Sequence, residues 1–327
     1  MRWLVGSALA CLLTACGSGG SVAPSPSPTL AFAPIVLPTA QFSPGITLPT
    51  GIVANLITAT NVLTDGSTGG ALEIGATWTA IEYPSATSTA AYGPAVTASG
   101  YRVAGSFKMA GAPYQFDNAF YYDSASSTFA TIDPPASFCA PAACNEAIAH
   151  SNYGTTAFEI VGNCDSVSSA PAPLAYSLTS NAFLFTSATN AYTRINVPDA
   201  ISTTAYGIWI DSDTIVAGGY TDQHGTHAYV RDLASSKILT YDYPGASITH
   251  FEGITGAGGN GNYNLAGNYS SGASATVYGF FLPVRDWQFG TPIVLGAVSA
   301  NSVYQRTVIG VMPDGASSTG YIATIPD

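Results

Sequence analysis

Histidine and carboxylate side chains near the start of one predicted strand are the first candidates for chemistry. His250 and Glu252 lie two residues apart, so on a strand their side chains share a face. Together with Asp211, from the preceding repeat, they could bind a metal ion or polarise a sugar in a central channel. The alternative is ordinary hydrogen bonding in turns and caps. We favour this alternative, so no metal site is predicted.

A pair of acids could instead hydrolyse a glycosidic bond, which requires two carboxyl groups about 5 to 9 Å apart. The candidates near predicted inner strands are Glu146, Asp211, Asp213 and Glu252. They do not recur at matched positions with a supporting arginine, and Asp211-Ser-Asp213 is typical of a β-turn. The chain has no G-x-S-x-G motif, no S-x-x-K motif and no phosphate-binding loop. The sequence therefore predicts no catalytic residue and no cofactor.

Aromatic residues are a better indication of binding. Nineteen tyrosines and four tryptophans occur in a chain of which only 8% is charged. Flat side chains such as Trp209 and Trp287 can stack on carbohydrate or pack against a protein. The net charge of −11 and the lack of any basic run exclude nucleic acid as a partner. The expected ligand is therefore a carbohydrate or a protein.

Two further histidines lie three residues apart in a predicted hairpin. His224 falls in a polar turn, and we expect solvent around it. His227 recurs at a fixed position of a repeat described below, so we expect a structural role for it.

The elements that position these residues are strands that repeat along the chain. One strand has an aliphatic residue, a glycine two positions later and, in most copies, a large residue two positions after that. Its five copies are Val103–Phe107, Ile160–Cys164, Val216–Tyr220, Leu265–Tyr269 and Val308–Met312. We expect each glycine to make room for an aromatic side chain of the following strand. Short runs precede the copies, among them Glu146–Ala149, Tyr206–Trp209 and Glu252–Thr255.

Four short strands in about 50 residues, repeated around the chain, predict an all-β protein with a β-propeller fold. The last repeat stops after its third strand, and Trp78–Ala86 matches the missing fourth. We expect this N-terminal strand to close a ring of five four-stranded blades and to leave no open edge. Leu56–Leu72 could form one more partial unit, so six blades are the alternative.

The first sixteen residues have the pattern of a lipoprotein signal peptide. Met1-Arg2 is a positive start, and Trp3–Leu13 is an apolar run too short to span a bilayer. Leu13-Thr-Ala-Cys16 resembles the bacterial lipobox, which implies cleavage before Cys16 and lipidation of that residue. Gly17 fits sorting to the outer membrane of a Gram-negative host. The predicted location is the bacterial cell envelope, with the membrane as a partner through the lipid anchor. The alternative is a plain secretory signal cleaved nearby.

These features divide the chain into three parts. Residues 1–15 are the predicted signal peptide, residues 16–49 a tether rich in glycine, serine and proline, and residues 50–327 the repeat domain.

Cysteine usage predicts at most one disulfide bond in the repeat domain. Cys139, Cys144 and Cys164 are left once Cys11 leaves with the signal peptide and Cys16 is lipidated. We favour Cys139–Cys144, within a turn-rich loop, with Cys144–Cys164 as the alternative. The absence of a C-x-x-C pair argues against zinc.

Two repeats resemble the HAF repeat of bacterial extracellular proteins. The better match runs from Gly207 through Val216–Tyr220 and His227–Tyr229 to Tyr243–Ala246, and the other covers Gly253–Phe280. The motif is eroded elsewhere. The resemblance implies an extracellular repeat protein and carries over no catalytic residue. We therefore expect a membrane-anchored, non-catalytic binding propeller. The alternatives are a glycosidase-like hydrolase with carboxylates in the central channel and a purely structural surface protein.

Overall fold

The computed structural model describes residues 30–112, 118–139, 144–167, 177–271, 276–315 and 317–326. These residues form strands and one short 3-10 helix, η1 (Ala136–Cys139), so the all-β prediction is confirmed. No helix in these ranges combines the length and the apolar character needed to cross a bilayer. The predicted signal peptide, Cys16 and the first part of the tether lie outside the described residues.

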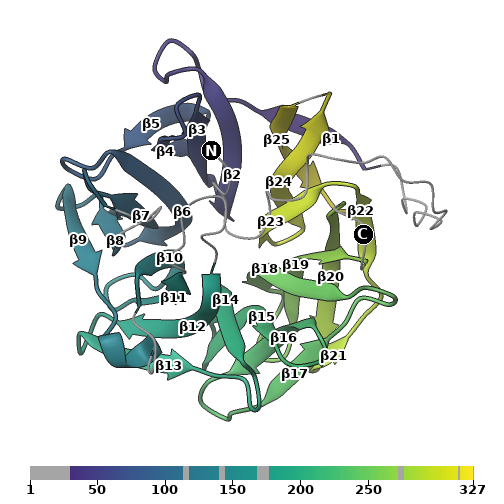
Figure 1. Ribbon diagram of the computed structural model, residues 1–327. Helices are drawn as coiled ribbons and strands as arrows, with labels where there is room; N and C mark the ends of the chain where they lie inside the picture. Colours follow the sequence, from purple (N-terminus) through teal and green to yellow (C-terminus); the bar gives the residue numbers. More distant parts are fainter. Residues whose placement is uncertain are drawn as a thin grey trace.

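The described strands pair into six antiparallel units that stand in a ring, as in a β-propeller (Figure 1). The first unit contains β2 (Gly45–Val53), β3 (Leu56–Leu63), β4 (Thr68–Ile74) and β5 (Thr77–Ile81). The second contains β6 (Ser88–Thr97), β7 (Gly100–Lys108), β8 (Asn118–Asp123) and β9 (Thr128–Ile132). The third contains β10 (Glu146–Tyr153), β11 (Glu159–Val167), β12 (Ser177–Thr186) and β13 (Ala191–Ile195).

The other three units complete the ring. The fourth unit contains β14 (Ser202–Ile210), β15 (Thr214–Thr221), β16 (Thr226–Asp232) and β17 (Ile238–Tyr241). The fifth contains β18 (Ile248–Gly256), β19 (Tyr263–Ser270) and β20 (Tyr278–Arg285), and both β21 (Gln288–Phe289) and β22 (Ile293–Gly296) pair with the outer edge of β20. The sixth contains β23 (Ser299–Tyr304), β24 (Thr307–Asp314) and β25 (Ser317–Thr324), together with β1 (Phe32–Ile35).

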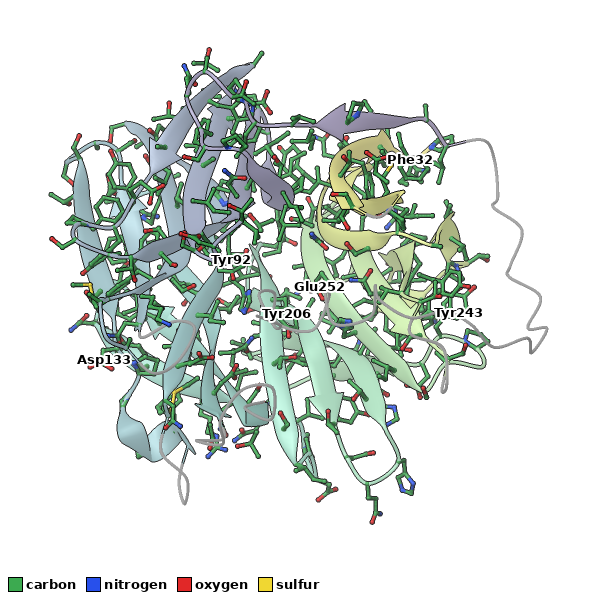
Figure 2. The ribbon with its side chains drawn as sticks, turned by 45° about the horizontal axis from the view of Figure 1, so that its top comes forward. Phe32, Tyr92, Asp133, Tyr206, Tyr243 and Glu252 are labelled. Atoms are coloured by element: carbon green, nitrogen blue, oxygen red, sulfur yellow. A yellow bond between two sulfur atoms is a disulfide. The ribbon has the colours of Figure 1, made fainter. Side chains whose placement is uncertain are left out.

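Ring closure uses an N-terminal strand, but a different one from that expected. β1 pairs with β25 from Phe32↔Ala323 to Ile35↔Gly320, and the ring of Phe32 packs edge-on against Tyr321 at 4.9 Å (Figure 2). The expectation for Trp78–Ala86 is wrong, because Trp78 lies in β5 and pairs with Glu73 of its own unit. The folded ring therefore begins within residues 16–49, which the sequence assigned to the tether.

The described strands group into six units, whereas the repeats favoured five, because the first unit lacks the repeat signature. In the other five, a glycine of the second strand faces an aromatic residue of the third. The pairs are Gly105↔Phe120, Gly162↔Phe183, Gly218↔Tyr229, Gly267↔Phe280 and Gly310↔Tyr321. In the first unit the equivalent pair is Ala59↔Ala71.

The glycines of these pairs have a steric role. A Cβ atom added to Gly105, Gly162 or Gly267 would lie 2.6 Å from the ring of the facing phenylalanine. The tip of each ring therefore occupies the space that the glycine leaves free, as expected from the sequence. Only glycine permits so close an approach within a strand.

The hydrophobic core lies between neighbouring units. One cluster joins Ala217 and Val230 of the fourth unit to Phe251 and Leu265 of the fifth. Ile35 and Ile309 of the last unit pack against Ile52 of the first. Because each unit buries its faces only against its neighbours, the closure of the ring determines how much apolar surface is buried.

The disulfide bond joins Cys144 to Cys164, with their Cα atoms 5.6 Å apart. The preference for Cys139–Cys144 is therefore wrong, and the alternative pairing is the one found. Cys144 precedes β10, and Cys164 of β11 lies opposite Ala147 of β10. The pairing of these two strands therefore brings the two cysteines together. Cys139 is the last residue of η1.

Neighbouring residues in and after β1 allow a test of ring closure. Ile35 is 6% exposed, whereas Val36 is 62% exposed. We expect Ile35→Ala to lower the free energy of unfolding by about 2 to 4 kcal/mol, because it leaves a cavity between the last and first units. Val36→Ala should change it by less than about 0.5 kcal/mol. Urea unfolding measures both, and equal effects would contradict closure through β1.

Candidate functional site

A β-bulge occurs at the same place in the innermost strand of every unit. The ladder register shifts between Pro49 and Gly51 in β2, and equivalent shifts occur in β6, β10, β14, β18 and β23. A bulge places two residues opposite one and re-aims a side chain. The residues at the bulges, here called the axial ring, are Thr50, Tyr92, His150, Tyr206, Glu252 and Asn301.

A small residue follows each member of the axial ring and touches the next inner strand. A Cβ atom added to Gly93 would lie 2.5 Å from the Cα atom of Ser151. One added to Gly253 would lie 3.0 Å from the Cα atom of Ser302. Glycine and serine therefore allow the six inner strands to converge on the axis.

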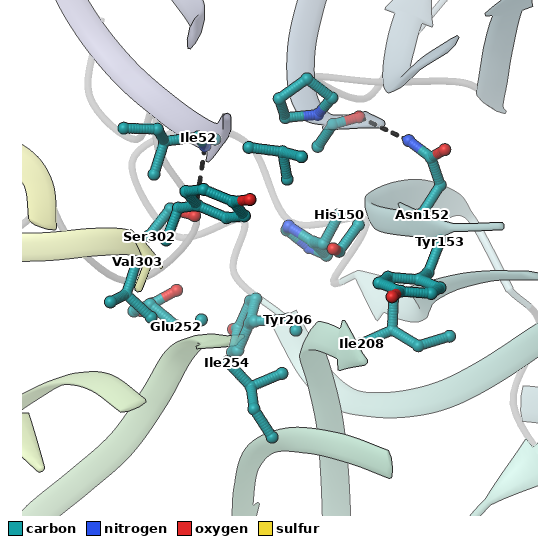
Figure 3. Close-up of a pocket in the computed structure, with 18 of the residues that line it drawn as sticks. Ile52, His150, Asn152, Tyr153, Tyr206, Ile208, Glu252, Ile254, Ser302 and Val303 are labelled. Atoms are coloured by element: carbon teal, nitrogen blue, oxygen red, sulfur yellow. Dashed lines mark hydrogen bonds between the residues drawn. The ribbon is translucent and has the colours of Figure 1, made fainter. Parts of the chain in front are cut away.

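Side chains of the axial ring interact around the axis (Figures 2 and 3). Thr50 donates a hydrogen bond to the carbonyl of Ala91 at 2.6 Å, and Asn301 donates one to the carbonyl of Pro49 at 2.8 Å. The ring of His150 lies 5.1 Å from that of Tyr92 and 4.7 Å from that of Tyr206. The axis is thus lined at this level by polar and aromatic side chains from all six units.

His250 and Glu252 meet at the axis, as their spacing predicted. Nδ1 of His250 lies 3.2 Å from Oε1 of Glu252, and the two side chains are 12% and 14% exposed. Burial lowers the pKa of His250 to about 4. Burial also raises the pKa of Glu252 to about 8, against an opposing hydrogen bond from Asn268. Near neutral pH burial therefore favours the uncharged form of both side chains.

Aliphatic residues lie on one side of the axial ring. Ile52, Ile208, Ile254 and Val303 line this part of the channel (Figure 3). The free volume among them and the ring is about 30 Å³, enough for about two water molecules.

A much larger cavity lies on the other side, where the inner strands begin. Its volume is about 430 Å³, and it extends over the third, fourth and fifth units. We call it the hydroxyl pocket, and it is lined by Thr179, Ser180, Ile201, Ser202, Thr204, Tyr206, Gly219, Tyr220, Thr221, Thr226, Ile248, His250, Asn268, Tyr269, Ser270 and Val277. None of these described lining residues is an acid, a lysine or an arginine. The pocket therefore offers hydroxyl groups, tyrosine rings and an uncharged histidine.

Turns between units shape the rim of this pocket. Asp199 and Gly245 follow prolines and have φ angles of 63° and 80°. In each turn the amide two residues after the proline bonds back to the carbonyl just before it, as Ala246 does to Tyr243 at 2.9 Å. Such turns place a left-handed residue after proline, which explains the glycine of the Pro-Gly-Ala motif. The segments that carry Ile201 and Ile248 start immediately afterwards.

Other candidate acids lie away from the His250–Glu252 pair. Asp211 accepts a hydrogen bond from Trp209 at 2.8 Å in the turn after β14. This is the turn bonding that the sequence favoured, so Asp211 does not join His250 and Glu252. Asp213 lies in the same turn and accepts one from Asn260. Glu146 begins β10 and faces Asp165 across the ladder. Glu252 is thus the only carboxylate among the described residues that line the axial cavity.

The remaining candidates do not line the pocket either. His227 bridges Asp242 at 2.6 Å and Asp222 at 3.2 Å. Partial burial opposes protonation of His227, but these two hydrogen bonds raise its pKa overall. His224 is exposed in the adjoining turn. Trp287 packs beneath Lys237, whose Nζ lies 4.8 Å from the ring. The aromatic residues of the pocket are tyrosines instead.

Sequence reasoning missed most of the axial ring. Its only signal is a polar or aromatic residue before a small one in each short run, as in Tyr206-Gly and Glu252-Gly. The sequence pattern aligns Glu146–Ala149 with these runs, whereas the bulge places His150-Ser151 there. A four-residue error in alignment thus hid His150, whose pKa burial lowers to about 3.

Comparison with known proteins identifies no family. No family model matches the chain, and no curated protein matches it. A lectin of Aleuria aurantia in complex with alpha-methyl-L-fucoside is 11% identical, with a TM-score of 0.48 over 86% of this chain and 90% of that one. A sialidase of Trypanosoma rangeli with 2,3-difluorosialic acid is 9% identical, with a TM-score of 0.48 over 86% of this chain and 54% of that one.

A third similar structure is a puromycin-hydrolyzing peptidase of Mycobacterium tuberculosis. It is 12% identical, with a TM-score of 0.44 over 87% of this chain and 52% of that one. At such values the description of the fold rests on the strand pairing of this chain, and no functional residue carries over.

The buried acid predicts a pH-dependent effect of Glu252→Gln. An unfolded glutamate loses its proton near its ordinary pKa of 4.5, whereas folded Glu252 keeps it to about pH 8. The wild type therefore loses stability between these values as pH rises, and glutamine does not. We expect the unfolding free energy of Glu252→Gln, relative to wild type, to increase steadily from pH 5 to pH 8.

Urea titrations at several pH values measure this difference. Asp286→Asn, which removes a negative charge from an exposed turn, is the matched control. A difference that stays constant with pH for Glu252→Gln would contradict the buried, protonated state.

Proposed function

We propose that the protein is a lipid-anchored, six-bladed β-propeller that binds a neutral carbohydrate in the hydroxyl pocket. The observation that carries the proposal is the pocket itself. Its volume of about 430 Å³ lies within the roughly 300 to 1,000 Å³ typical of small-molecule sites.

The chemistry of the lining supports a neutral ligand rich in hydroxyl groups. Seven of the lining residues are serine or threonine and three are tyrosine. A charged ligand would have to leave water without gaining a counter-charge from the described lining, which is costly. The net charge of −11 also repels anionic ligands.

The hydrolase alternative has one observation in its favour. Glu252 retains a proton near neutral pH, as a general acid must. Hydrolysis of a glycoside also requires a second carboxyl group or an equivalent nucleophile. Activity that Glu252→Gln abolishes, with ligand binding retained, would favour this alternative over simple binding.

A purely structural role would require no concave site. The hydroxyl pocket is the feature that favours binding over that alternative.

Replacing pocket hydroxyls tests the proposal. Oγ1 of Thr221 lies 3.1 Å from Oγ1 of Thr226, and both threonines line the pocket. We expect Thr221→Val with Thr226→Val to weaken binding of a neutral oligosaccharide by about 10-fold or more, because two hydrogen-bonding groups are lost. Calorimetry on the full chain, kept free of lipid by Cys16→Ser, measures the affinity.

Thr128→Val, on the exposed outer strand β9, is the matched control. Failure of every neutral oligosaccharide in a broad panel to bind would overturn the proposed function. So would an equal loss of affinity in the control.

The sequence supports the lipid anchor and a place in the cell envelope. The lipobox-like Leu13–Cys16 and the resemblance to HAF repeats are its basis. We expect the wild type, expressed in a Gram-negative bacterium, to incorporate labelled palmitate and to sediment with membranes. Cys16→Ser should do neither, because its residue 16 has no thiol to acylate. Cys139→Ser is the control, and palmitate incorporation in Cys16→Ser would contradict the anchor.

A further inference from the structure

Two exposed isoleucines on the rim of the hydroxyl pocket point to a narrower class of ligand. We propose that the ligand is an oligosaccharide of at least two sugar rings bearing methyl groups that contact Ile201 and Ile248. This inference rests on the proposed function, since it concerns the same pocket.

Exposure of these side chains is unusual for the molecule. Ile201 is 63% exposed and Ile248 is 44% exposed. Among the described residues, the other large hydrophobic side chains with comparable exposure are Val36, Val96 and Met109, and none of these lines the pocket. Apolar side chains left in water beside a cavity mark a contact surface for a ligand.

The strand register fixes the spacing of the two isoleucines. The amide of Ile201 donates to the carbonyl of Thr221 at 2.8 Å, Thr221 pairs with Thr226, and Thr226 pairs with Ile248. Three strand spacings separate the two backbones, roughly 14 Å in all. One pyranose ring is too short to contact both isoleucines, so the ligand extends over at least two.

Along this row of paired residues the side chains are apolar at the two ends and polar in the middle. The hydroxyl groups of Thr221 and Thr226 lie between the two isoleucines and can meet sugar hydroxyls. Against the isoleucines, a sugar hydroxyl would lose water without gaining a partner, whereas a methyl group gains by burial. Each methyl group so buried is worth about 4-fold in affinity, and two about 15-fold.

Methyl groups on neutral sugars occur in N-acetyl substituents and in 6-deoxyhexoses. Both present the same apolar contact, so the probes must distinguish them. Oligomers of β-1,4-linked N-acetylglucosamine are compared with glucose oligomers of the same linkage and length. Disaccharides of a 6-deoxyhexose are compared with those of the corresponding hexose.

Calorimetry on the full Cys16→Ser chain measures the affinity ratio within each pair. In one of the two comparisons we expect the methyl-bearing sugar to bind about 15-fold more tightly than the sugar without the methyl groups. We also expect the dimer of that methyl-bearing sugar to bind more tightly than its monomer. Ile201→Ser with Ile248→Ser should reduce the ratio to near 1 and leave the affinity for the counterpart unchanged. The matched control, Val36→Ser with Val96→Ser, should keep the ratio.

Different results overturn different claims. Equal binding within both pairs by the wild type overturns the methyl contact and leaves the proposed function standing. A ratio that persists without the isoleucines also overturns it. If none of the four sugar series binds, this inference fails, whereas the proposed function fails only if the whole panel of neutral oligosaccharides also does not bind.

Discussion

Convergence of six inner strands on a narrow axis is the constraint on which the rest of the structure depends. The chain meets it with a bulge in each inner strand followed by a glycine or serine, whose lack of bulk lets neighbouring strands approach. Gly93 beside Ser151 and Gly253 beside Ser302 show how little space is left. The bulge also turns one side chain of each strand toward the axis, so the device that closes the ring creates the polar axial ring.

Once polar side chains are buried at the axis, their charge state follows from desolvation. His250, His150 and Glu252 are surrounded by neighbouring inner strands, and burial favours the uncharged form of each. The aliphatic residues on one side leave a free volume of only about 30 Å³ in the channel. His250 and Tyr206 also line the hydroxyl pocket on the other side. The part of the pocket lining nearest the axis is therefore uncharged, because closure of the ring buries these side chains.

Sequence patterns could reveal the fold because one steric relation recurs. A glycine opposite an aromatic ring, as in Gly267 and Phe280, leaves the same residues at the same spacing in five units. The first unit replaces this pair with Ala59 and Ala71, which satisfy the same space with two small side chains and leave no recognisable motif. β1 escaped detection because four residues around Pro34 have no periodicity of their own and become a strand only against β25.

The site was less predictable than the fold because it depends on which side chains a bulge turns inward. His250 and Glu252 were found because residues two apart share a face of a strand. Asp211 does not join this pair, because it follows β14 into a turn, where it accepts a hydrogen bond from Trp209. Tyr206 and His150 carry no chemical motif, and only three-dimensional register brings them together. A register is set by contacts between strands, so it cannot be read from either strand alone.

A chain with 8% charged residues must recognise its ligand by other means. Long-range attraction is unavailable in the hydroxyl pocket, since none of its described lining residues carries a fixed charge. Recognition there depends on short-range hydrogen bonds and apolar contacts, and both act only when ligand and wall fit closely. A rigid ring suits this mode of binding, because residues such as Thr226 and Ile248 are held in place by strand pairing between units. The same closure that buries the core therefore preorganises the pocket.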